Sequence, residues 1–434
     1  MAPQNRQRRP PAPAHPSRGG PQRRRSALAA AVHGDRAGGL TLAAAAAAAL
    51  VWANWSGASY HSVWYRPAPW SAPLGVPLSV QGWVNQALLL GFFALVGLEI
   101  RREVNAGELS SRRRAVTPVL AAAGGMAVPA LIYTAIVAGG PAAGAWGVPM
   151  ATDVAFALGA LALIGGVSAR ARVFLMTLAV ADDIFSIVIL VAVYSHHTRA
   201  AWLVGGVAAL AALGALWGWA PGSLPGMAGV RAALAVVAWW ALLKAGVEAA
   251  VVGAAMGAFI PGRRPLHRDG RGQGGPQVRR WVRRLEAAVN VGILPVFALA
   301  NVGVPLGGGW TANGAAWRIL AAVAVARLVG KPLGIFLTTM GVTRLYPDVY
   351  QPRIVRRGLL GVGAVASVGF TVPLLIVRTD LGTGSLATAA VVGLLLGSVL
   401  GAAASTAILH SGPTRPEELA AAGGRSWSGR RRVG

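Results

Sequence analysis

The chain has 434 residues, of which 55% are hydrophobic and 12% are charged, whereas roughly 25% of the residues of an average soluble domain are charged. This composition excludes a disordered chain, argues against a soluble globular enzyme and indicates a membrane protein, and the absence of cysteine excludes disulfide bonds and thiolate metal sites. The net charge of +26 does not indicate nucleic-acid binding, because nearly all Arg residues lie in the tails or between apolar runs.

The first element is a tail, residues 1–36, which is rich in Arg, Pro and Gln and has no apolar periodicity. This composition predicts a disordered basic tail that helps to orient the protein and contacts anionic lipid. It is not a signal peptide, because the basic stretch is too long and the next apolar run continues into a full span. The expected organisation is therefore this tail, a transmembrane domain over residues 37–411 and a second disordered tail over residues 412–434.

Twelve apolar segments follow the tail, and most approach the roughly 20 residues that a membrane-spanning helix requires. They cover residues 38–54, 82–100, 115–138, 145–166, 172–194, 200–219, 229–243, 246–260, 285–303, 314–340, 357–377 and 384–409. If the N-terminus is cytoplasmic, 33 of the 40 basic residues fall on the cytoplasmic side and 5 on the outer side. This asymmetry supports an even number of spans and predicts an all-α integral membrane protein in which both tails are cytoplasmic.

The fourth segment contains a candidate broken helix at Thr152 and Asp153. Gly147 and Pro149 precede these residues, and proline removes a backbone hydrogen-bond donor from an apolar stretch. Backbone groups freed in this way must be satisfied by protein or by a cavity, because lipid offers no partner. We expect Asp153 to offset the positive N-terminal end of a half-helix and the Thr152 oxygen to ligate a cation. The alternative is an ordinary N-cap, which also requires the break.

Two adjacent acids, Asp182 and Asp183, lie in the middle of the fifth segment with apolar residues on both sides. Adjacent helical residues point about 100° apart, so one carboxylate can face a cavity while the other faces a neighbouring helix. Two carboxylates this close do not ionise together readily in a low dielectric, and one of them can hold either a proton or a metal cation. The pair therefore indicates the exchange of cations and protons, while the apolar flanks disfavour a helix cap.

The tenth and eleventh segments carry the corresponding features of the C-terminal half. Lys331 is one of two lysines in the chain, which favours a compact or titrating charge over a snorkelling side chain. Arg327 lies four residues earlier on the same helical face, and snorkelling explains it equally well. The eleventh segment is interrupted by glycines and by Pro373. Interrupted spans in both halves predict inverted-topology repeats with two broken helices.

Two more acids lie near the ends of spans. Glu99, together with Arg102 and Glu103, forms either an interfacial ion cluster or a solvated helix end. Glu248 lies just inside the eighth segment near the outer face, within pairing range of Lys244.

Six motifs resemble the NhaA family of bacterial sodium/proton antiporters. In chain order they are FFALVGLEIRRE, ATDVAFALG, LAVADDIFSIVI, LPVFALANVGV, VGKPLGIF and SVGFTVPLLI, between about residues 80 and 378. The resemblance implies twelve spans with two crossing broken helices. It also implies export of Na⁺ or Li⁺ against a larger number of protons, electrogenic and regulated by pH, without a cofactor, and it leaves a homodimer open.

The resemblance assigns roles to individual residues. Asp183 matches the main carboxylate for cation and proton, Asp182 its neighbour that pairs with Lys331, and Thr152 a residue beside the ion. These three oxygen-bearing side chains would bind Na⁺ transiently. Asp153 and Lys331 match the charges that compensate the helix ends at the crossing. The residues that match the cluster associated with pH activation are Glu99, Arg102, Glu103 and Glu286.

The chain departs from the family at two positions that concern the pH profile. Glu248 occupies the position of a family histidine, and Gln86 occupies that of an acid expected after Asn85. The tails are also longer and more basic than is usual in the family.

Two other functions fit parts of the pattern. A sodium-coupled symporter of an organic anion would share the fold but would need a larger cavity and an anion-binding group. An intramembrane aspartyl protease would need two Asp residues on facing helices, whereas Asp182 and Asp183 are adjacent and splay apart. The sequence therefore predicts a transporter and not an enzyme.

Overall fold

The structure, a computed structural model, describes residues 21–164, 167–194, 199–219, 227–259, 276–346 and 354–411. This part of the chain is helical apart from turns, loops and one isolated β-bridge between Pro67 and Ser79. Nine of its segments are long and apolar enough to cross a membrane, and two further apolar helices are shorter. The predicted all-α membrane protein is confirmed, and the helix count is compatible with the twelve expected segments.

Helix α1 (Pro21–Trp55) begins earlier than expected. Residues 21–36, which belong to the predicted disordered tail, are helical in the structure, while residues 1–20 and 412–434 lie outside the described part. The segment 21–36 is rich in Ala and Arg, which favour helices, and it continues directly into the apolar span that begins at Ala37. The second half of the basic segment is thus an extension of the first helix.

The next helices follow the predicted segments closely. After the short α2 (Gly57–Trp64), α3 (Val80–Trp83) continues through a π-helical turn (Val84–Leu88) into α4 (Leu89–Ala106). Helix α5 (Arg112–Val137) then packs against α7 and α14.

The fourth predicted segment is a broken helix. A 3₁₀ turn (Ala143–Gly147) leads into non-helical residues 148–153, and α6 (Val154–Ile164) follows. Helix α7 (Ala169–Tyr194) completes a three-helix unit with α5 and α6.

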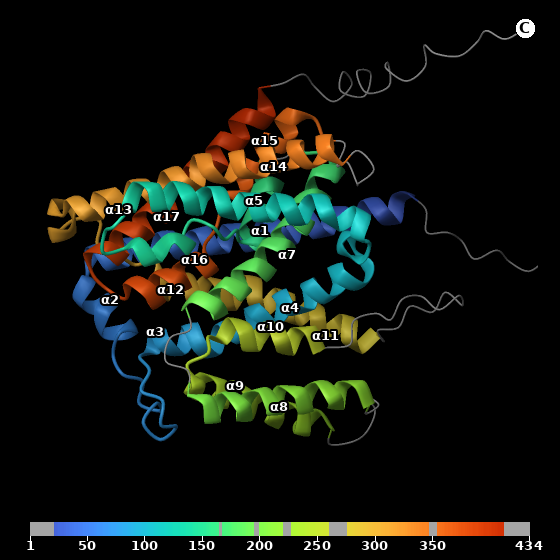
Figure 1. Ribbon diagram of the computed structural model, residues 1–434. Helices are drawn as coiled ribbons and strands as arrows, with labels where there is room; N and C mark the ends of the chain where they lie inside the picture. Colours follow the sequence, from blue (N-terminus) through green and yellow to red (C-terminus); the bar gives the residue numbers. More distant parts are fainter. Residues whose placement is uncertain are drawn as a thin grey trace, which may run out of the picture.

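Three helices follow this three-helix unit. Helices α8 (Ala200–Trp219) and α9 (Met227–Ala245) form a pair at one edge of the bundle (Figure 1). The predicted span 246–260 is the 11-residue helix α10 (Ala249–Phe259), which packs against α4.

The remaining helices include the second broken helix. Helix α11 (Pro276–Ala288) continues through a π-helical turn (Val289–Ile293) into α12 (Leu294–Asn301). In the same way, α13 (Gly314–Val325) continues through a π-helical turn (Ala326–Gly330) into α14 (Lys331–Leu345). Helix α15 (Arg356–Ala366) is separated by residues 367–370 from α16 (Thr371–Ile376), which a π-helical turn (Val377–Leu381) extends, and α17 (Ser385–His410) is last.

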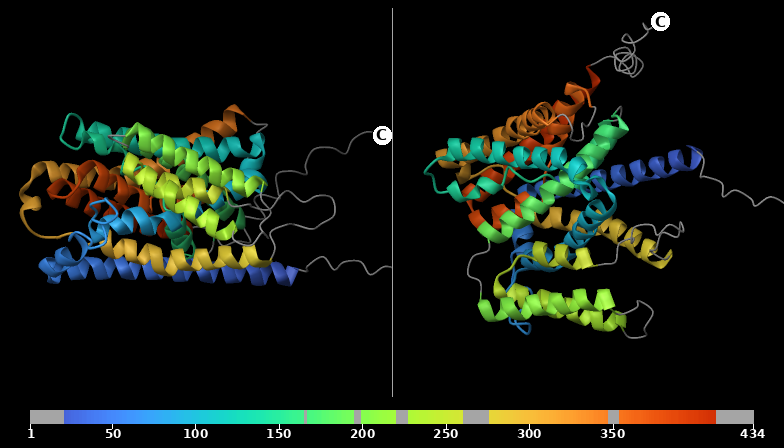
Figure 2. Two further views of the ribbon diagram at one scale, coloured as in Figure 1. Left: turned by 90° about the horizontal axis from the view of Figure 1, so that it is seen from below. Right: turned by 45° about the vertical axis from the view of Figure 1, so that its right-hand side comes forward.

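Two units of the same design cross the bundle in opposite directions. Each consists of a long helix, a broken helix and a long helix: α5–α6–α7 and α13/α14–α15/α16–α17. The first helices of the two units lie antiparallel side by side (Figures 1 and 2). In the second broken helix, Arg356–Leu381, 94% of the apolar 18-residue stretch is buried inside the protein. Lipid therefore does not reach its non-helical backbone, which lipid could not satisfy.

Helices α4 and α10 approach each other so closely that two glycines are required. A Cβ on Gly97 would collide with the carbonyl of Ala254, and a Cβ on Gly257 with that of Ala94. Because small residues set the approach of membrane helices, we expect Gly97→Ala to lower the free energy of unfolding by about 1–3 kcal/mol. The midpoint of thermal unfolding in detergent measures this. In the control Gly205→Ala, the new Cβ meets nothing within 4 Å, and an equal loss there would contradict the argument.

Candidate functional site

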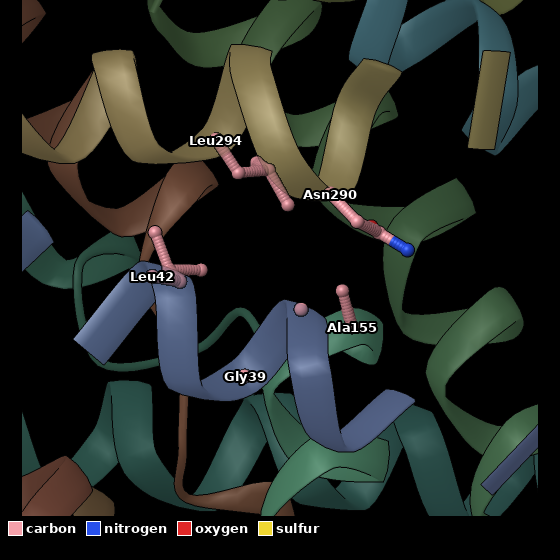
Figure 3. Close-up of a pocket in the computed structure, with 6 residues that line it drawn as sticks. Gly39, Leu42, Ala155, Asn290 and Leu294 are labelled. Carbon is pink, nitrogen blue, oxygen red and sulfur yellow. The ribbon is translucent and has the colours of Figure 1, made fainter. Parts of the chain in front are cut away.

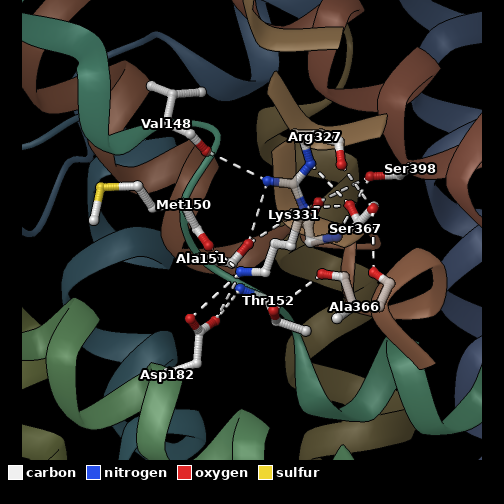
Figure 4. Close-up of polar contacts among 12 residues, drawn as sticks. Val148, Met150, Ala151, Thr152, Asp182, Arg327, Lys331, Ala366, Ser367 and Ser398 are labelled. Atoms are coloured by element: carbon white, nitrogen blue, oxygen red, sulfur yellow. Dashed lines mark hydrogen bonds and ion pairs between the residues drawn. The ribbon is translucent and has the colours of Figure 1, made fainter. Parts of the chain in front are cut away.

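The two breaks lie against each other in the middle of the bundle. The hydroxyl of Thr152 donates a hydrogen bond to the carbonyl oxygen of Ala366 at 3.0 Å, and the N–H of Asp153 donates to Val368 O at 3.2 Å (Figure 4 shows the first contact). Residues more than 200 positions apart in the sequence thus satisfy each other's backbone groups at the breaks.

One carboxylate, Asp153, serves the N-terminal ends of both half-helices. Its Oδ1 accepts a hydrogen bond from the N–H of Phe156 in the first turn of α6 at 3.2 Å. Its Oδ2 accepts hydrogen bonds from the hydroxyl and the N–H of Thr371, the first residue of α16, at 3.0 and 3.4 Å. A buried negative charge between two positive helix ends is favourable. Asp153 is therefore an N-cap of α6 and also a partner of the second half-helix.

A buried ion pair joins α7 to the start of α14. The Lys331 ammonium lies 3.1 Å from Asp182 Oδ2, and both residues are fully buried. The same oxygen accepts the N–H of Thr152 at 2.6 Å, and Lys331 also donates to the carbonyl of Met150 (Figure 4). Asp182 is therefore engaged by a cation and by the backbone of the first break.

The neighbouring Asp183 is in a different situation. It is 6% exposed, and its carboxylate makes no hydrogen bond or ion pair with any residue that the structure describes. The charges of Asp182, Asp153 and Glu99 act on it unfavourably, and that of Lys331 favourably. Such a carboxylate gains free energy when it binds a proton or a cation.

Sequence reasoning missed several residues near this site. The hydroxyl of Ser186, one helical turn beyond Asp183, is buried without a hydrogen-bond partner among the described residues. Ser398 on α17 donates to Gly369 O at 3.2 Å, and Arg327, which the sequence leaves ambiguous, is fully buried beside Lys331. A single serine in an apolar helix carries no distinguishing signal, because its partners come from another part of the chain.

The four residues expected to form a pH-responsive cluster lie on two helices, with Glu99, Arg102 and Glu103 on α4 and Glu286 on α11. Arg102 and Glu286 form an exposed ion pair at 3.4 Å. Glu103 accepts hydrogen bonds from the Thr177 hydroxyl at 2.9 Å and from the Glu108 N–H at 2.8 Å, so it ties α4 to the helix of the Asp pair. Glu99, one turn earlier, is half-buried and within electrostatic range of Asp183.

A small cavity lies next to the first break, between α1, α6 and the junction of α11 with α12 (Figure 3). Its volume of about 20 Å³ is enough for roughly one water molecule. It is lined by Gly38, Gly39, Leu42, Ala155, Asn290 and Leu294. Because Ala155 is two residues from Asp153, a water molecule here would lie close to the start of α6.

The two positions that depart from the NhaA pattern contact each other. The Gln86 amide donates to Glu248 Oε2 at 2.8 Å, and the Thr379 hydroxyl donates to Oε1 at 3.3 Å. These hydrogen bonds connect the π-helical turn before α4, which contains Gln86, with Glu248 directly before α10 and with Thr379 in the π-helical turn after α16. The two departures therefore form one matched pair.

The free-energy coupling between Gln86 and Glu248 can be measured. A hydrogen bond to a charged group is worth about 1.5–3 kcal/mol, and Glu248 is partly exposed. We expect a double-mutant cycle of Gln86→Ala and Glu248→Ala to give a coupling energy of about 1.5 kcal/mol, at the low end of that range. Unfolding of the four proteins in detergent measures it, and strictly additive effects would mean that the contact contributes nothing.

The comparisons with known proteins agree with one another. The sequence profile of the family described as Na⁺/H⁺ antiporter 1 matches residues 29–409, a range that includes both breaks and the Asp pair. The chain is 41% identical over 384 residues to the Na(+)/H(+) antiporter NhaA of Acidovorax sp., an alignment that covers 85% of this chain and 88% of that protein. It is 37% identical over 386 residues to the Na(+)/H(+) antiporter NhaA of Cronobacter sakazakii, covering 87% of this chain and 95% of that protein.

Proposed function

The chain belongs to the Na⁺/H⁺ antiporter 1 family, and we propose that it exports Na⁺ or Li⁺ in exchange for protons, with Asp183 binding the cation and the proton in turn. It is a transporter and not an enzyme. The observation that supports the site best is the contrast on α7, where Asp182 is held by Lys331 and Asp183 has no partner among the described residues. The symport of an organic anion finds no support in these matches.

The proposed exchange follows from competition for one carboxylate. A proton or a cation can neutralise Asp183, but both cannot occupy it together, so uptake of one releases the other. Oxygens of the carboxylates and of unwound backbone are the ligands that transporters use for Na⁺. We assign the Asp183 and Asp182 carboxylates and the Thr152 hydroxyl to the cation, and the unpartnered Ser186 hydroxyl offers a further oxygen. Asp183 alone would exchange one proton for one cation, so electrogenic exchange, with more protons than cations moved, requires a second proton, which we assign to the Asp182 carboxylate. No cofactor takes part.

The same proposal includes location and regulation. The asymmetry of basic residues supports a bacterial inner-membrane protein with both termini in the cytoplasm. On that side, α11 exposes Arg283 and Arg284, and this supports contact with anionic lipid. We assign the pH response to Glu99, Arg102, Glu103 and Glu286. A homodimer stays a prediction, which the mass of the detergent-solubilised protein tests.

Collapse of a pH gradient in proteoliposomes tests the function. Vesicles that contain the protein and are acidic inside are expected to lose their gradient on addition of Na⁺ or Li⁺, at a rate that depends on pH. The exchange should proceed without any organic solute, because the cation and the proton are the only cargo. No collapse at any pH, or collapse only with an organic anion, would overturn the proposal.

A further inference from the structure

Arg327 is a fully buried cation that the proposed exchange does not use. We propose that Arg327 is a positioning residue, whose guanidinium joins the two breaks and neutralises their free backbone carbonyls and thereby holds the cation site in shape. The inference concerns the site of the proposed function and therefore rests on it.

The guanidinium contacts both breaks at once (Figure 4). On the second break, Nε donates to the carbonyl of Ser367 at 2.9 Å, and Nη2 donates to the same oxygen. On the first break, Nη1 donates to Val148 O at 3.4 Å, and Nη1 and Nη2 both donate to Ala151 O at 3.2 Å. The Ser367 hydroxyl returns a hydrogen bond to the Arg327 carbonyl at 2.8 Å. One side chain therefore links three segments of the chain.

These carbonyls are the ones that need a cation. The last carbonyls of a helix have no partner within the helix and carry partial negative charge. Ser367 directly follows the end of α15, and Val148 and Ala151 follow the 3₁₀ turn of the first break. Asp153 already serves the two N-terminal ends. Arg327 is its counterpart at the C-terminal end of α15 and at the non-helical backbone after the 3₁₀ turn of the first break, so Asp153 and Arg327 offset opposite partial charges at the crossing.

Only an arginine fits this position. The N–H donors of its planar guanidinium reach two segments of the chain at once, whereas a lysine ammonium is a single point charge. The surroundings make room for it, because a Cβ on Gly369 would collide with Nη2 of Arg327 and with the carbonyl of Ala151. A Cβ on Gly397 of α17 would lie 3.1 Å from Cβ of Arg327. Two glycines, one in the second break and one on α17, thus make room for one side chain.

The two buried cations, Arg327 and Lys331, have different partners and therefore different tasks. Ala151, which Arg327 holds, directly precedes Thr152, whose N–H and hydroxyl reach Asp182 and Ala366. Arg327 thus fixes the backbone from which Thr152 is presented. Lys331 is then left to pair with Asp182, so the expected set of compensating charges, Asp153 and Lys331, does not include the arginine that contacts both breaks.

Three variants and one control test this role. Arg327→Lys keeps the charge but not the fork, Arg327→Met removes both, and Gly369→Ala keeps the arginine but displaces it together with the Ala151 carbonyl that it contacts. Arg318→Met, on the exposed side of α13, is the control. The readouts are the apparent KM and maximal rate for Na⁺ in proteoliposomes. A second readout, the shift of the thermal unfolding midpoint as Na⁺ is titrated, reports binding without transport.

The expected result separates binding from folding. Arg327→Lys and Gly369→Ala should insert normally and raise the apparent KM and the midpoint of the Na⁺ titration about tenfold, or ~1.4 kcal/mol. Their maximal rates should stay near that of the parent. Arg327→Met should lose exchange, and the control should match the parent. Unchanged KM and Na⁺ titration in Arg327→Lys and Gly369→Ala would overturn the proposal, whatever Arg327→Met does. Failure of the unaltered protein to exchange would instead count against the proposed function.

Discussion

Replacement of Asp183 by asparagine is expected to abolish exchange while the protein remains inserted and folded. Asparagine keeps the size and polarity of the side chain, but it neither carries a charge nor takes up a proton. Because the Asp183 carboxylate has no hydrogen bond or ion pair among the described residues, the change breaks no contact there. It also removes the repulsion that Asp182, Asp153 and Glu99 exert. Thermal stability should therefore be unchanged or higher.

The measurement is the collapse of the pH gradient at equal amounts of incorporated protein. Glu108→Gln serves as a control for an acid-to-amide change, since Glu108 lies in the turn after α4 and pairs with Arg114 at 3.7 Å. It should exchange like the parent protein. Exchange by Asp183→Asn at the rate of the parent would show that another group carries the cation and the proton.

The sequence predicted the different roles of the two acids, because helical geometry separates adjacent side chains. In the structure the two side chains diverge: Asp182 faces Lys331 on α14, and Asp183 has no partner in the described part of the chain, while their roles in exchange stay a prediction. The first break was also predictable, since Pro149 and the polar pair after it are costly in a lipid environment. In the second half, the break lies at residues 367–370, while Pro373 sits within α16.

Other features could not be read from the sequence. A snorkelling arginine and a buried one look the same within their own helix, and the partners of Arg327 lie 40 to 179 positions away. The helix over residues 21–36 is one of these features, because the Arg and Pro content of the basic tail favours disorder, although Ala and Arg favour helix formation where an apolar helix adjoins them. The contact of Gln86 with Glu248 is a pairing of distant residues, so single positions did not reveal it.

Removal of the Lys331 ammonium is expected to have the largest effect on stability. Lys331→Met leaves the Asp182 carboxylate fully buried and without its cation. Loss of one partner of a buried ion pair costs about 3–5 kcal/mol, because the remaining charge is neither solvated nor paired. The free energy of unfolding in detergent should fall by about that amount. Arg327 does not replace the lost cation, since its donors are directed at the carbonyls of Val148, Ala151 and Ser367.

The second variant, Asp182→Asn combined with Lys331→Met, separates charge from packing. Both charges are then absent, and a buried pair replaced by neutral groups is often tolerated. Asparagine still accepts the Thr152 N–H, so only the hydrogen bond from Lys331 to Met150 is lost without replacement. The double variant should therefore regain about 2 kcal/mol or more of the stability that Lys331→Met loses. If the double variant were as unstable as Lys331→Met, the loss would come from the shape of the lysine side chain, and the ion pair would not be what stabilises the junction of α7 and α14.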